Sequence, residues 1–76
     1  MKFKYDDTAK QNTWISDKYK IVEFDYVKMG NVLKYDPHFK VYYDGYLINS
    51  TNHKELIHAV KTCKTHSQTE VIYDEN

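Results

Sequence analysis

Cysteine, glycine, proline and arginine are scarce or absent in this 76-residue sequence, and each scarcity excludes something. Cys63 is the single cysteine, so no internal disulfide can form and a zinc site would have to rely on histidine. Two glycines are too few for a glycine-rich phosphate loop or a nucleophile elbow. All eleven basic residues are lysines, so the planar fork that grips guanine or phosphate through two hydrogen bonds is missing.

Long apolar runs and an excess of one charge are also missing. The first seven residues do not resemble a signal peptide, and no stretch reaches membrane-spanning length. Eleven acidic residues balance the eleven lysines, so bulk charge makes nucleic acid an unlikely partner. We therefore expect a soluble cytoplasmic protein without membrane contact. It should form a single domain over 1–76, with 1–13 and 67–76 less ordered.

Aromatic residues are plentiful, with eight tyrosines, three phenylalanines and one tryptophan. The run 19–28 is rich in β-branched and aromatic residues and predicts a strand, although its alternation does not show which face is buried. Residues 2–5 suit a short edge strand, and 6–13 a turn or short helix. Met29-Gly30-Asn31 can turn the chain, and Asp36-Pro37 interrupts it again. Between them, over 32–35, we expect a loop or frayed strand.

The clearest local signal is Asp44-Gly45 between the apolar runs 39–43 and 46–48. This pair predicts a two-residue type I′ hairpin, because both central positions need a positive φ. In that register Tyr43 faces Tyr46. Tyr42 and Leu47 then share the opposite side.

A C-terminal helix follows, with Asn52 as its expected N-cap and an end near His66. Helical spacing places Cys63 in an apolar stripe that packs on the sheet. Residues 71–73 could form a last strand, and 74–76 should fray. The expected fold class is α+β: a small antiparallel sheet of three to four strands with one main C-terminal helix on one face.

The histidines, the cysteine and the paired carboxylates are the side chains that could carry chemistry. Cys63 and His66 lie three residues apart, but Cys63 belongs to the apolar stripe, so we interpret it as a buried structural residue. The acidic pairs at the two ends lie in polar surroundings where solvation is their ordinary role. We therefore expect no enzyme activity, no catalytic residue, no metal and no cofactor.

The tyrosines indicate a binding surface. A small two-layer domain buries one face of its sheet, and these strands are aromatic on both faces, so a partner is needed to cover the rest. We expect a non-enzymatic module that binds another protein, with a homodimer as a second possibility. The expected contact residues are Tyr19, Ile21, Tyr35, Tyr42 and Leu47.

The order of Trp14, the 39–48 hairpin and the helix resembles small β-β-β-α accessory proteins of bacteriophages and prophages. The similarity covers about two thirds of the chain and lies in patterning. It implies an inhibitor or modulator of a host or defence protein, including the anti-CRISPR type. Such a protein would act in the host cytoplasm, and no functional residue carries over.

Two alternative functions remain open. The strands followed by a final helix also resemble the double-stranded-RNA-binding domain, which implies a nucleic-acid module contacting phosphates through Lys54, Lys61 and Lys64. That family has a lysine cluster at the start of the helix, where this chain has only Lys54. The other alternative is a self-associating structural protein.

Overall fold

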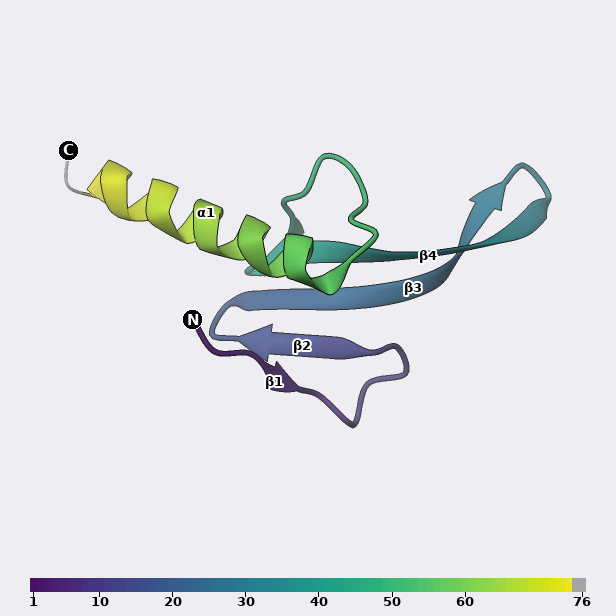
Figure 1. The fold of residues 1–76 in the computed structure, drawn as a ribbon, viewed down its shortest axis with the longest axis horizontal. Coiled ribbons are helices and arrows are strands. Elements are labelled where there is room, and N and C mark those ends of the chain that lie inside the picture. Colours follow the sequence, from purple (N-terminus) through teal and green to yellow (C-terminus); the bar gives the residue numbers. More distant parts are fainter. Residues whose placement is uncertain (75–76) are drawn as a thin grey trace.

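The chain forms an antiparallel meander of five strands followed by one long helix (Figure 1). The computed structural model describes residues 1–74, with side-chain surroundings through residue 68. The strand order β1-β2-β3-β4-β5 follows the sequence, and α1 covers one face. This confirms the α+β class, with five strands in place of three to four. The elements are β1 (Lys4–Tyr5), β2 (Thr13–Ser16), β3 (Tyr19–Met29), β4 (Val32–Tyr43), β5 (Tyr46–Leu47) and α1 (Leu56–Asp74).

The two long strands β3 and β4 form the central hairpin of the sheet. Gly30, with φ of 61°, turns the chain between Met29 and Val32, which face each other across the hairpin. At the next turn Asp44 and Gly45 both have positive φ, 50° and 86°, as the predicted type I′ hairpin requires. The turns and the strand over 19–28 are thus confirmed. Of the loop or frayed strand expected over 32–35, the strand is what the structure shows, since β4 runs through these residues.

A β-bulge explains how a strand passes through Pro37. Phe24 faces His38 and Tyr26 faces Tyr35, so the intervening Asp25 is opposed by two residues, Asp36 and Pro37. Proline has no N–H to donate to the ladder and is tolerated in a strand at such a bulge. The proline therefore interrupts the pairing locally without ending the strand.

The N-terminal segment adds two short strands to the sheet. The edge strand at 2–5 is confirmed as the short β1, which pairs with β2. The turn expected within 6–13 is present at residues 7–8. Strand β2, which follows it, was not predicted. The amide of Asp6 donates to the Thr13 carbonyl at 2.8 Å, so hydrogen bonds reach across this segment. Trp14 of β2 faces Ile21 of β3.

Helix α1 begins and ends later than predicted. Asn52 is not its N-cap, because His53 and Phe39 exchange two backbone hydrogen bonds of 2.7 and 3.2 Å that hold this loop extended. The carbonyl of Glu55 accepts the first helical bonds instead. The expected end near His66 and the expected strand over 71–73 are both wrong, since the helix continues to Asp74. Of the fraying expected over 74–76, residues 75–76 lie outside the described part.

The core lies between α1 and one face of β3 and β4. Ile21 and Val41, directly opposed in the sheet, are fully buried against Ala59 and Cys63 of the helix. Tyr19 belongs to the same cluster with 5% of its surface exposed. Tyr19 and Ile21 were expected on the exposed patch, and this placement is wrong. They occupy odd positions of β3, and the odd side is the one that α1 covers.

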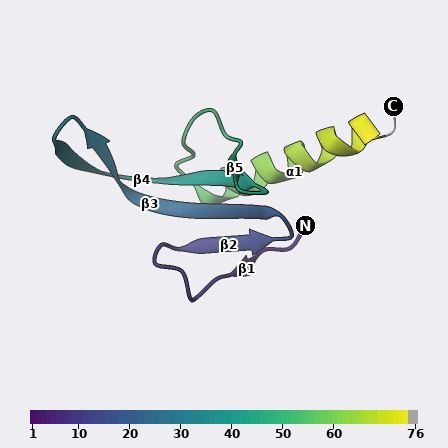
Figure 2. The ribbon, with the colours of Figure 1, turned by 180° about the vertical axis from the view of Figure 1, so that it is seen from behind.

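Two segments project beyond this core in opposite directions (Figures 1 and 2). One is the end of the β3–β4 hairpin beyond the bulge, residues 25–36, hereafter the arm. The other is the C-terminal part of α1. Together they give the molecule extents of 47 × 27 × 20 Å. Within residues 1–74, no helix has the length and apolar character that a membrane span requires.

Candidate binding surfaces

The face of the sheet away from α1 carries lysines and rings side by side, and Figure 2 shows that no helix covers it. We call it the helix-free face. Side chains alternate along a strand, so the residues next to the buried core residues of β3 and β4 point to this opposite face. The paired strands up to the bulge place these side chains on it: Lys4, Thr13, Ile15, Lys20, Val22, Phe24, His38, Lys40, Tyr42 and Leu47.

Contacts between these side chains order the middle of the helix-free face. The Lys20 ammonium lies over the Tyr42 ring at 5.9 Å from its centroid, and that of Lys40 over the Phe24 ring at 5.2 Å. Phe24 in turn stacks on His38, with ring centroids 5.8 Å apart and planes 20° apart. Each cation thus rests on an aromatic ring, an arrangement that holds both in place at the surface.

His38 is buried on this face, as are Thr13 and Val22, and its hydrogen bond shows which ring nitrogen carries a proton. Nδ1 lies 2.7 Å from the carbonyl oxygen of Asp36, which can only accept, so Nδ1 carries the proton and donates. The bond fastens the ring across the bulge. The Phe24 ring therefore rests on a fixed neighbour.

The arm exposes large apolar side chains on both of its faces. Tyr26 and Tyr35 face each other, with their rings edge to face at 5.6 Å. Between 57% and 67% of each of the following side chains is exposed: Tyr26, Met29, Val32, Leu33 and Tyr35. A two-stranded ribbon has no second layer that could cover these groups.

The predicted contact residues fall in three separate places. Tyr19 and Ile21 lie beneath the helix, Tyr35 lies on the arm, and Tyr42 and Leu47 lie on the helix-free face. The remaining apolar residues of the arm were not predicted. The signal was present, since Gly30-Asn31 separates two apolar runs by the two residues that a tight hairpin needs.

The three lysines considered for nucleic-acid binding do not form one cluster. Lys54 lies in the loop before α1 and pairs with Asp36, and its hydrogen bond to this carboxylate lowers the pKa of Asp36. Lys61 and Lys64 are exposed on the helix. The charge of Lys54 is therefore already engaged at the base of the arm.

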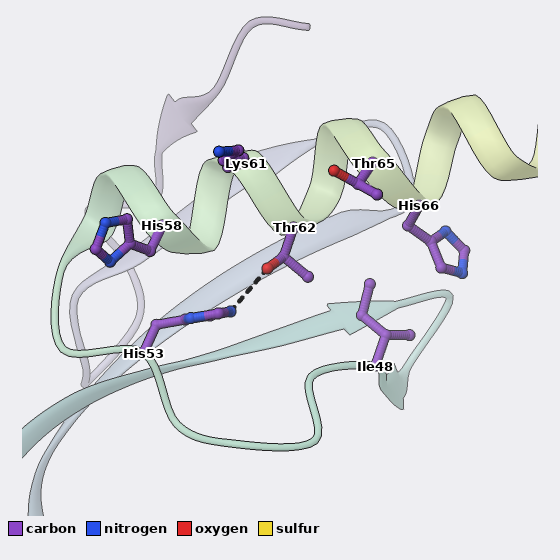
Figure 3. A pocket seen from close by; sticks show the side chains of 7 residues that line it. All are labelled: Ile48, His53, His58, Lys61, Thr62, Thr65 and His66. Atoms are coloured by element: carbon purple, nitrogen blue, oxygen red, sulfur yellow. Dashed lines mark hydrogen bonds between the residues drawn. The ribbon is translucent and has the colours of Figure 1, made fainter.

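A hollow of about 450 Å³ lies between the helix and the loop after β5 (Figure 3). His53 points across it, with Nε2 2.7 Å from the Thr62 hydroxyl, and His66 Nδ1 lies 2.7 Å from the Tyr19 hydroxyl. The first contact fastens the loop to the helix and the second fastens the helix to the sheet. Both histidines thus make contacts that hold elements of the fold together.

Cys63 occupies the apolar position that helical spacing indicated. It is fully buried, and desolvation raises its pKa to about 11, which keeps the thiol protonated at neutral pH. Its predicted role as a buried core residue is confirmed. Across the described residues, no group of three or more histidine, cysteine or acidic side chains has a geometry suited to a metal ion.

No family model, curated protein or solved structure was found to match the chain. The resemblances to phage accessory proteins and to double-stranded-RNA-binding domains therefore stay predictions.

Proposed function

We propose that this chain is a non-enzymatic binding module that holds a protein partner through the arm. The observation that carries the proposal is the cluster of exposed apolar side chains on a projecting hairpin. Single exposed apolar residues are common on soluble proteins, but contiguous groups mark interaction sites. Tyr26, Leu33 and Tyr35 form such a group on one face of the arm, and Met29 and Val32 lie together on the other face.

The backbone of the arm offers a second means of binding. Glu23 donates to the Asn12 carbonyl at 2.9 Å, and within residues 1–74 this is the last backbone bond from β3 toward β2. On the other side, the His53 bridge to Phe39 closes the outer edge of β4 only up to that point. Both edges of the arm are therefore open, and a partner can add a strand there.

The composition of the arm favours protein over nucleic acid at this site. Its charged residues are Asp25, Lys28, Lys34 and Asp36, which cancel. A neutral arm exerts no net attraction on phosphate. Apolar and aromatic anchors are instead the groups that dominate binding energy between proteins. Inhibition of a host or defence protein, which the phage resemblance implies, is a specific form of this proposal.

A photo-crosslinking experiment tests the proposal. A benzophenone amino acid is placed at Leu33 on the arm and, as a matched control, at Ile57 on the helix, which is 69% exposed. We expect adducts with a protein from position 33 and none from position 57. An adduct of twice the 9.1 kDa chain mass identifies a second copy as the partner. Equal labelling from both positions, or none from position 33, contradicts the proposal.

Substitution on the arm provides the complementary test. Leu33→Ser should prevent capture of the crosslinked partner, while the free energy of unfolding changes by no more than about 0.5 kcal/mol because the side chain is exposed. Ile57→Ser is the control and should leave capture unchanged. Persistent capture by Leu33→Ser places the interface elsewhere.

A further inference from the structure

We propose that the helix-free face binds single-stranded nucleic acid, with Lys20 and Lys40 contacting phosphates and Phe24 and Tyr42 stacking on bases. This site is distinct from the protein interface proposed on the arm. It lies on the other side of the bulge, over the paired body of the sheet. The proposal depends on how charge and aromatic rings are distributed between the two faces.

The chain has no net charge, but its basic and acidic residues are unequally distributed between the two faces of the sheet. Up to the bulge, the helix-free face takes Lys4, Lys20 and Lys40 from the paired strands and no acidic residue. Glu23 and Asp25 occupy odd positions of β3, on the side of the helix. Because a strand alternates its side chains, a neutral sequence produces a face whose paired strands carry lysines and no carboxylate. That face is complementary to a polyanion.

The rings lie where the bases of a bound strand would lie. Phe24 and Tyr42 are half-buried; Tyr42 lies opposite Lys20, Phe24 lies opposite His38, and Lys40 occupies the row between them. Residues on one face of a strand are spaced by about 7 Å, so the four groups can follow a backbone over a site of roughly four nucleotides. The lysines that now cover the two rings can move onto phosphates as bases take their place.

Single strands fit this face better than the other polyanions. A duplex keeps its bases paired and stacked, so the rings would contribute nothing to its binding. An acidic protein would engage the lysines and leave the stacking surfaces unused. Combined lysine and ring contacts, by contrast, are the means by which single strands are bound without sequence preference.

One carboxylate borders the site and supplies a sensitive test. Asp6 follows β1, accepts hydrogen bonds from the amide and hydroxyl of Thr8, and interacts with Lys20. These contacts, the Thr8 bonds first, lower its pKa, so it is anionic at neutral pH. Asp6→Asn keeps the acceptor oxygen and removes the charge. This variant should bind the oligonucleotide about twofold to fivefold more tightly.

Fluorescence anisotropy with a labelled twelve-nucleotide oligothymidylate measures the binding, with a single-stranded RNA of equal length and a DNA duplex in parallel. We expect both single strands to bind more tightly than the duplex. For the two lysine contacts, log K should fall against log salt with a slope of about −1.4. Lys20→Gln or Lys40→Gln should each reduce the slope by about 0.7. Phe24→Leu should weaken binding at least about fivefold, and Phe24→Tyr should retain it.

The controls separate this site from the others. Lys61→Gln and Lys64→Gln alter the exposed helix and should have no effect, as should Leu33→Ser on the arm. The proposal is overturned by a flat titration at low salt with folded protein or by equal affinity for duplex. It is equally overturned if polyglutamate displaces the oligonucleotide at equal charge, or if the helix lysines matter as much as Lys20. Since Leu33→Ser tests the arm alone, failure of either proposal is recognisable without the other.

Discussion

Burial of Cys63 makes the stability of the fold depend on pH in the alkaline range. Desolvation raises the pKa of this thiol from its ordinary value of 9.0 to about 11 in the folded protein. In the unfolded chain the thiol ionises at its ordinary pKa. The unfolded state therefore binds fewer protons than the folded state between these two values, and stability must fall as pH rises through this window.

The size of this effect follows from the two values. At pH 10 the thiolate of the unfolded chain outnumbers the neutral thiol by about ten to one, whereas the thiol of the folded protein is still mostly neutral. This difference lowers the free energy of unfolding by about 1.3 kcal/mol between pH 8 and pH 10. Below pH 8 the contribution of the thiol is constant.

Urea denaturation of the wild type and of Cys63→Ala at both pH values measures the effect. The alanine variant loses apolar volume at every pH but has no thiol to ionise, so the titrations of tyrosine and lysine cancel in the comparison. We expect the stability gap between the two proteins to narrow by about 1.3 kcal/mol at pH 10. A gap that stays constant would refute a raised pKa at Cys63.

Substitutions at three further positions probe the core and one turn by urea denaturation. Ile21→Ala should lower the free energy of unfolding by about 2–5 kcal/mol because the side chain is fully buried, and a loss below 1 kcal/mol would contradict its central position. Tyr19→Phe removes the hydroxyl that meets His66 and should cost about 1 kcal/mol. Gly45→Ala meets no atom within 4 Å, so its cost of about 1 kcal/mol comes from the positive φ alone. Gly45→Asn should be milder, and equal losses would contradict this reasoning.

Local chemistry made part of the fold predictable from the sequence. The Asp44-Gly45 turn, the strand over 19–28 and the buried position of Cys63 depend on neighbouring residues, and the structure confirms them. Strand β2 was missed because four residues between polar segments give too short a pattern to read. The continuation of the strand through Pro37 was not predicted, because only the partner strand shows that a bulge accommodates the proline.

The binding surfaces were harder to predict because they depend on which face the helix covers. Both sides of β3 carry apolar residues, so alternation alone could not assign Tyr19 and Ile21 to the core. Ala59 and Cys63 of helix α1 pack on the face of β3 that carries the odd-numbered residues, and this contact determines which face is buried. The charge separation was readable in principle, since Lys20 and Glu23 have opposite parity in the strand. A total charge of zero conceals it.

The bulge at Pro37 also has a dynamic consequence, because it weakens the ladder where the arm leaves the body. Beyond it only two strands remain, and an isolated two-stranded ribbon is marginally stable in water. The arm should therefore open and close while the body stays folded. Amides of 26–35 should exchange with deuterium much faster than those of 19–22 and 39–43, and uniform rates would show a single cooperative unit. A partner that binds this hairpin must hold it in one conformation, and the free-energy cost of this ordering weakens the complex.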